Sequence, residues 1–195
     1  MEYLGRQSSE PSQQKINVVL QRLARSKNVR ADLSQVLELA IGMTGADMGT
    51  LQRFEDADDS LQIVASRGFS DEALAYFHRV RRDTNTTCAV ALMRRMHVFV
   101  GDVFRSYLFV GRPELEVLRR LGIAAAQSTP LISSTGRFWG VVSTHFRKPQ
   151  PEGCFDHVSL NQLAVQVADS LEQWETSASN LNSSDEQAPL PMDRP

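Results

Sequence analysis

The sequence has no excess of charge of one sign, because 21 Lys and Arg residues stand against 23 Asp and Glu residues in a chain of 195. The formal net charge of -2 argues against binding of nucleic acid or anionic lipid through bulk charge. The sequence also lacks an apolar run of about 18 residues, and its first residues contain no hydrophobic stretch that a signal peptide needs. We therefore expect a cytoplasmic protein that binds neither nucleic acid nor membrane.

Cysteine is scarce as well, and Cys88 and Cys154 are too few for a disulfide framework or a four-thiolate zinc site. The four histidines are scattered without a helical i, i+4 pair, so no metal is expected. Glycine motifs that cradle phosphate are missing, as are the short signatures of zinc proteases and serine hydrolases. These absences favour a protein without cofactor, metal or catalytic residues.

The chain is long enough for one domain with appendages. Both ends are rich in Ser, Asn, Gln and Pro and lack the apolar surface that would offset the entropy of ordering. The predicted organisation is a disordered N-terminal segment (1–12), an N-terminal helix with its linker (13–30), one folded domain (31–175) and a disordered C-terminal tail (176–195).

Strands are predicted mainly in pairs. Alternating apolar residues predict one hairpin over 48–54 and 61–66, and a second over 123–132 and 138–146. Further elements are a helix ending at a left-handed Gly45, a helix capped by Ser70 over 71–80, helical turns over 88–94, a strand over 97–100, a helix over 114–121 and a long helix over 155–175. Hairpins with helices at both ends of the chain indicate an α+β fold, in which Pro130 needs a bulge or an edge position.

Candidate site residues come from loop position and strand alternation. Cys88 follows two threonines at a predicted helix N-terminus, which can lower a thiol pKa, although we favour a small buried side chain at a tight turn. Asp102 either accepts hydrogen bonds from a ligand or organises its own loop. His145 is expected to be buried and hydrogen-bonded. The candidate pocket residues are Cys88, Phe99, Asp102, Phe104, Tyr107, Phe109, Gln127 and Thr129.

Apolar residues of the last helix step by four and three, which is the spacing of a heptad seam. We expect this seam to pair with a second copy of the chain in a homodimer, together with the helix at residues 16–23. Packing within one chain is the alternative. The seam residues are Leu160, Ala164, Val167, Leu171 and Trp174.

Five segments in this order resemble the GAF domain family over roughly residues 31–175. They are 36–52, 61–69, 98–103, 122–131 and 136–146, the last reading GRFWGVVSTHF. The resemblance implies a PAS-related α+β fold with a six-stranded antiparallel sheet, terminal helices on one face and a loop-capped pocket on the other. It also implies a non-catalytic bacterial sensor that binds a small molecule or a partner and signals through its terminal helices to an output such as a histidine kinase.

Departures of this sequence from the motifs of other family members narrow the range of candidate ligands. The motif of the cyclic-nucleotide binders is missing, and Cys154 is followed by Phe155 where bilin photoreceptors usually place histidine after the attachment cysteine. Ala89 replaces the glycine that many relatives place after the cysteine at 88, and the loop 104–109 lacks an expected acid-proline pair. The enzymatic alternative is a free methionine-(R)-sulfoxide reductase that uses Cys88, although residues 110–113 offer no second thiol. A ligand-free dimerisation or docking module is the second alternative.

Overall fold

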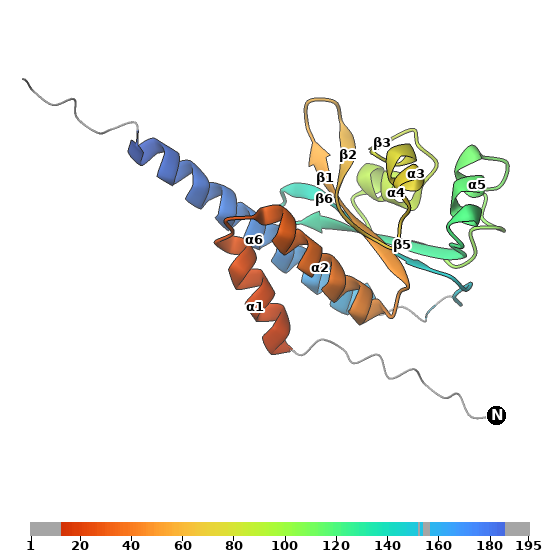
Figure 1. Ribbon diagram of the computed structural model, residues 1–195, viewed down its shortest axis with the longest axis horizontal. Coiled ribbons are helices and arrows are strands. Elements are labelled where there is room, and N and C mark those ends of the chain that lie inside the picture. Colours follow the sequence, from red (N-terminus) through yellow and green to blue (C-terminus); the bar gives the residue numbers. More distant parts are fainter. Residues whose placement is uncertain (1–12, 152, 154–156, 186–195) are drawn as a thin grey trace, which may run out of the picture.

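The computed structural model describes residues 13–151, 153 and 157–185. In chain order its elements are α1 (Gln13–Ala24), α2 (Val29–Thr44), β1 (Met48–Glu55), β2 (Ser60–Arg67), α3 (Asp71–Tyr76), β3 (Arg79–Arg81), α4 (Thr87–Arg94), β4 (Val98–Val100), α5 (Pro113–Arg120), β5 (Ala125–Ile132), β6 (Phe138–Phe146) and α6 (His157–Asp185). Figure 1 shows them arranged as a central sheet with helices on both sides.

The six strands form one sheet in the order β3-β2-β1-β6-β5-β4, and every neighbouring pair is antiparallel. The predicted α+β architecture and both predicted hairpins are therefore confirmed. The sequence pattern predicts one helix over 71–80 and misses the strand β3. The helix ends at Tyr76, and three residues then pair with β2, with Val80 buried between exposed Arg79 and Arg81.

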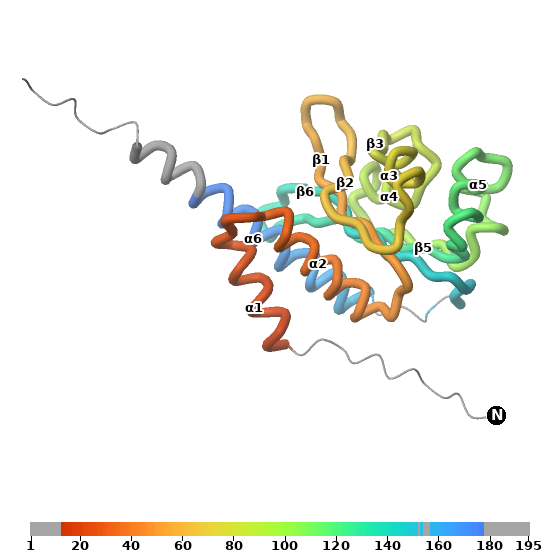
Figure 2. Tube along the Cα trace, viewed as in Figure 1, coloured from red at the N-terminus to blue at the C-terminus, as the bar shows by residue number. Residues whose placement is uncertain are grey.

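Helices and loops divide between the two faces of the sheet (Figure 1 and Figure 2). On one face α2 packs on β1 and β2, α6 packs on β5 and β6, and α1 packs on both of these helices. This layer holds the largest apolar cluster, which includes Leu23, Leu37 and Leu51. On the other face α4 packs on β5 and β6, while the loop after β4 and α5 contribute a further cluster around Phe109 and Ile123.

Local signals in the sequence fix the ends of several elements. Gly45 closes α2 in the left-handed conformation with a φ of 62°, which glycine adopts without steric penalty, as predicted. The Ser70 hydroxyl accepts a hydrogen bond from the Ala73 amide at the start of α3, which confirms the predicted cap. Pro130 lies beyond residues 126–128, where β5 pairs with β4, so the second side of β5 is open at the proline.

The heptad seam of α6 is buried within the chain. Leu160, Ala164, Val167 and Leu171 are at most 5% exposed and belong to the cluster shared with α1 and α2. The Trp174 indole donates a hydrogen bond to the Ser26 carbonyl at 3.0 Å. The expected dimer surface is therefore occupied by the chain itself, which corrects that prediction in favour of intramolecular packing.

The helix α6 continues ten residues beyond its predicted end at residue 175 and stops at Asp185. The first part of the expected disordered tail is thus helical, and the remainder of the tail lies outside the described residues, as do residues 1–12 and Cys154. Within the described ranges, each helix is too short or too polar to cross a membrane.

Candidate functional site

A cavity of about 40 Å³ lies between the sheet and the layer formed by α3, α4 and α5. Its floor comes from five strands, because residues of β1, β2, β3, β5 and β6 point to this face. The floor residues are Thr50, Gln52, Ile63, Val80, Ala126, Ser143 and His145. The roof is apolar and mostly buried, and consists of Phe69, Phe77, Phe109 and Leu118.

The start of α4 forms a third, polar wall of the cavity. The Thr86 side chain caps this helix by accepting a hydrogen bond from the Ala89 amide. Beside the cavity the Ser128 hydroxyl donates to the Thr87 hydroxyl at 2.8 Å and lies 2.7 Å from the Ser143 hydroxyl. These hydroxyls satisfy one another and tie α4 to β5 and β6.

Cys88 faces this cavity from α4 as a buried free thiol. Burial raises its pKa, and hydrogen bonds from Thr86 and Gln52 oppose this effect without cancelling it. The Thr86 hydroxyl oxygen lies 3.2 Å from the Cys88 sulfur. A protonated, buried thiol is a poor nucleophile, so Cys88 matches the small buried side chain that the sequence favoured.

Two polar side chains of the cavity floor have an atom without a hydrogen-bond partner. Within the described part of the chain, Gln52 Oε1 and His145 Nδ1 are both buried and unpartnered. Burial lowers the pKa of His145 to about 4, against a smaller opposing effect of a hydrogen bond with the Met48 backbone. The neutral ring packs edge-on against Phe69, with 5.2 Å between ring centroids. The expectation of a buried histidine is thus confirmed, but one ring nitrogen lacks a partner.

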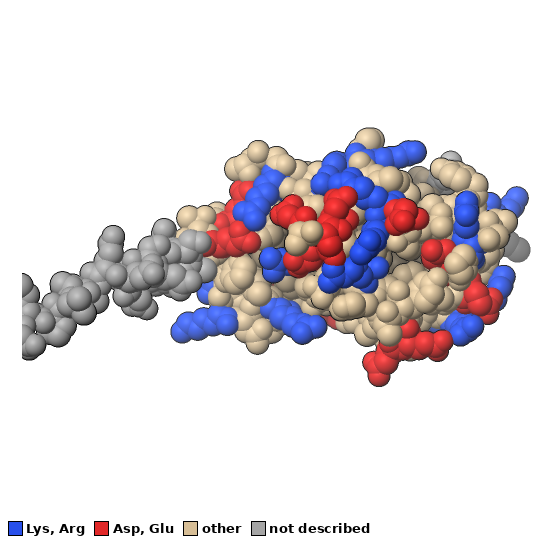
Figure 3. Space-filling view, turned by 90° about the horizontal axis from the view of Figure 1, so that it is seen from above, with Lys and Arg blue, Asp and Glu red and all other residues tan. Residues whose placement is uncertain are grey.

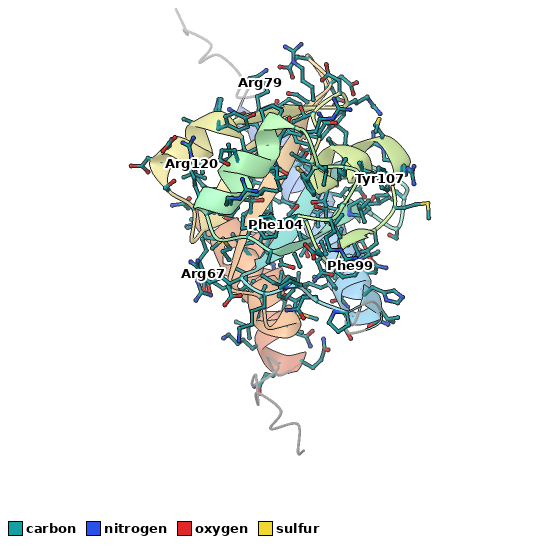
Figure 4. The ribbon with its side chains drawn as sticks, turned by 90° about the vertical axis from the view of Figure 1, so that its right-hand side faces the viewer. Arg67, Arg79, Phe99, Phe104, Tyr107 and Arg120 are labelled. Carbon is teal, nitrogen blue, oxygen red and sulfur yellow. The ribbon has the colours of Figure 1, made fainter. Side chains whose placement is uncertain are left out.

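The structure brings two of the predicted pocket residues, Cys88 and Phe109, to the cavity. Asp102 instead accepts a hydrogen bond from the Phe104 amide at 2.9 Å, so it organises its own loop. Phe104 is 38% exposed and Tyr107 is 90% exposed on the outside of that loop (Figure 4). These three residues therefore do not reach the cavity.

Phe99, Gln127 and Thr129 lie on the opposite face of the sheet. The register pairs Phe99 with Gln127 and pairs Ser128 with Ser143 of the cavity wall, so the neighbours of Ser128 point away from the cavity. Gln127 Nε2 donates to the Thr144 hydroxyl at 2.9 Å, and the Thr129 hydroxyl lies 2.8 Å from His97 Nδ1. A shift of one residue in a strand inverts the face, which explains the difference from the prediction.

The predicted pocket includes none of the four polar floor residues, which are Thr50, Gln52, Ser143 and His145. A signal for the first two was present in the sequence. In β1 the polar Thr50 and Gln52 alternate with apolar Leu51 in a strand whose first five residues are all buried. Buried polar residues at every second position indicate a polar interior on one face of a sheet.

A groove of about 570 Å³ runs between α3 and α5 outside the apolar roof. One ion pair crosses this groove, because Arg120 of α5 contacts Glu72 of α3 at 2.9 Å, and Figure 4 shows Arg120 on this side of the molecule. Elsewhere, basic and acidic side chains are intermixed on the face seen in Figure 3. That face presents no extended surface of one sign among the described residues.

Comparisons with known proteins agree with this geometry. A family model described as "GAF domain" matches residues 28–173. One similar solved structure is the free methionine-R-sulfoxide reductase of Neisseria meningitidis in complex with its substrate, with 17% identity, coverage of 83% of this chain and 89% of that chain, and a TM-score of 0.64. A second is the GAF domain of an Acinetobacter phosphoenolpyruvate-protein phosphotransferase, with 12% identity, coverage of 84% of this chain and 94% of that chain, and a TM-score of 0.64. A third is bacteriophytochrome RpBphP3 of R. palustris, with 15% identity, coverage of 88% of this chain and 40% of that chain, and a TM-score of 0.62. At these identities the likeness establishes the fold alone. No curated protein matches the sequence.

Proposed function

This chain belongs to the GAF domain family, and we propose that it is a non-catalytic sensor that binds a small molecule in the cavity above the sheet and signals through α6. The observation that carries the proposal is a buried cavity with two unpartnered polar atoms, Gln52 Oε1 and His145 Nδ1, in its floor. Buried polar atoms are normally paired, so such atoms mark the position of a ligand group or of bound water.

A route for the signal runs along β6. This strand carries Ser143 and His145 at the cavity and enters, at its other end, the turn that joins it to β5. Groups of the turn hold α6: the Ser134 backbone amide donates to the Asp169 carboxylate at 2.7 Å, and the Thr135 hydroxyl donates to the Glu172 carboxylate at 2.7 Å. Arg137 of the same turn contacts Glu175 at 2.8 Å. We name these contacts the turn–helix clasp.

The output of the sensor lies in another segment or polypeptide, such as a histidine kinase. Because α6 continues to Asp185, a displacement at the clasp would move the helix that leaves the domain. A second copy of the chain is a further partner in this proposal, through surfaces other than the buried seam of α6. Either kind of partner would respond to the same event, which is a displacement of α6 at the turn–helix clasp.

Two features weigh against the reductase alternative. Cys88 is buried with a raised pKa, whereas a catalytic thiol needs access and thiolate character. The described residues that line the cavity also include no Asp, Glu, Lys or Arg, which an amino-acid substrate with two charges would need. GAF domains are in general regulatory, and both features agree with that role.

Native mass spectrometry of the protein isolated from its own cells tests the proposal. We expect a bound small molecule on the wild-type chain and its loss in Ala126→Val, which fills the cavity from β5. The matched control is Ala125→Val, since Ala125 is equally buried but points to the helix-covered face. A wild-type chain that carries no bound molecule, or equal occupancy in both variants, would contradict the proposed function.

A further inference from the structure

We propose that the cavity selects a small uncharged molecule that donates hydrogen bonds, with a primary amide as the representative chemistry. This inference rests on the proposed function, because it names the class of ligand for the same cavity. Three properties of the cavity carry it: the charge of its lining, the kind of polar atom left unpartnered, and its size.

The lining discriminates against ions. Its described members are apolar residues, hydroxyl residues, Cys88, Gln52 and His145, with no formally charged side chain among them. The His145 ring is neutral near pH 7, because burial disfavours its charged form. An ion placed here would lose its hydration without meeting a counter-charge, which is far more unfavourable than the burial of a neutral polar group.

The unpartnered atoms are both hydrogen-bond acceptors. Gln52 Oε1 is an amide oxygen and accepts only. The hydrogen bond with the Met48 backbone raises the pKa of His145, so the ring is the donor in that bond. Because Nδ1 has no partner among the described residues, we assign the ring proton to Nε2, which leaves a lone pair on Nδ1 of the neutral ring. A ligand that satisfies both atoms must bring N–H or O–H groups.

The other polar groups around the cavity have less need of a ligand. The Ser128 hydroxyl lies within hydrogen-bond distance of both Thr87 and Ser143, and Thr86 is engaged by the Ala89 amide. The volume of about 40 Å³ corresponds to roughly three water-sized positions. A molecule of about four non-hydrogen atoms with two donors, which is the size of acetamide, therefore fits with slight movement of the roof.

Three probes of nearly equal shape test this inference on the whole chain. Acetamide is neutral and donates, acetate is an anion, and acetone is neutral but only accepts. Titrations are followed by NMR through the Gln52 side-chain amide and the His145 ring nitrogens. We expect acetamide to bind saturably with a Kd in the millimolar range. Acetate and acetone should bind at least about tenfold more weakly, since each leaves the buried acceptors unpartnered.

Two variants test whether Gln52 is responsible for the preference for acetamide over acetone. Gln52→Met removes the acceptor at similar volume and should reduce the preference for acetamide over acetone about tenfold. The control is Gln127→Met, which replaces a second buried glutamine with an unpartnered Oε1 on the opposite face of the sheet. That variant should keep the wild-type preference. If Gln52→Met does not fold, the three titrations of the wild-type chain still decide the question.

Several outcomes would overturn the inference. They are acetate or acetone binding as tightly as acetamide, no saturable binding of any probe, and equal effects of Gln52→Met and Gln127→Met. Cavity binding of acetate or acetone would refute the ligand class and leave the proposed sensor function standing. Absence of any bound molecule on the native chain would instead refute that function.

Discussion

Gln52 of β1 and His145 of β6 lie on neighbouring strands of the cavity floor. Each is a buried polar residue with one hydrogen-bond acceptor that has no partner among the described residues. A buried group in this state lowers stability by roughly 1–3 kcal/mol, because it has lost water and gained no protein partner. We propose that a bound hydrogen-bond donor relieves this unfavourable arrangement. In this account the two residues determine selectivity, while the apolar roof excludes water.

The pH dependence of stability should report the burial of His145. The ordinary pKa of 6.5 falls to about 4 in the folded chain. Between these values the unfolded chain holds the extra proton, so stability decreases as the pH is lowered from 6.5 to 4. The loss should be on the order of 3 kcal/mol across that window. Urea unfolding at a series of pH values measures it.

The variant His145→Gln should remove this part of the pH dependence. His78→Gln serves as the control, because His78 is an exposed histidine of the same chain. If the difference in stability between wild type and His145→Gln stayed constant from pH 6.5 to 4, the ring would not be buried in its neutral form.

Among the elements, α6 has the most direct test, since its heptad spacing and its buried seam suggest different partners. Leu160 is 1% exposed within the cluster shared with α1 and α2. Leu160→Ala should therefore destabilise the chain by roughly 2–5 kcal/mol through the cavity that it creates. Val158→Ala, at a 55% exposed position of the same helix, should change stability by less than about 0.5 kcal/mol.

Unfolding at several protein concentrations separates the two arrangements of α6. Packing within one chain predicts a wild-type midpoint that does not depend on concentration. A midpoint that rises with protein concentration, and that loses this dependence in Leu160→Ala, would restore the seam as a dimer interface.

What the sequence could predict depends on how local the determinant is. Gly45 ends α2 and Ser70 begins α3 through contacts with neighbours in sequence, so both helix boundaries are predictable. The strand β3 has three residues, which are too few for a period to emerge, and it exists because β2 offers an open edge. The heptad spacing of apolar residues in α6 is visible in the sequence. The surface against which these residues pack depends on tertiary structure, which the spacing does not encode.

The candidate site was harder to predict than the fold. Cys88 and Phe109 reach the cavity as expected, while Gln127 and Thr129 miss it by one position in β5. A strand buried on both faces gives no alternation by which to choose a face. Polar residues in the buried strand β1 were the available clue, and their significance depends on the roof that distant segments supply.

At the scale of the whole molecule, the sheet separates two layers of helices. One face holds the cavity beneath α3, α4 and α5, and the other face carries α1, α2 and α6. The strand β6 belongs to both, because alternate residues of one strand contact the two layers. The turn–helix clasp then attaches the end of β6 to α6 through Asp169 and Glu172. Occupancy of the cavity is thus expected to bias the position of α6.

Hydrogen exchange measured by mass spectrometry tests this coupling most directly. It compares the protein isolated from its own cells with the same protein after unfolding and refolding have removed bound molecules. With the cavity occupied, amides of residues 143–146 and of residues 169–175 should exchange more slowly together. A variant with Asp169→Ala and Glu172→Ala should keep the change in β6 and lose it in α6. Identical exchange of α6 in the occupied and empty wild-type chain would contradict signalling through this helix.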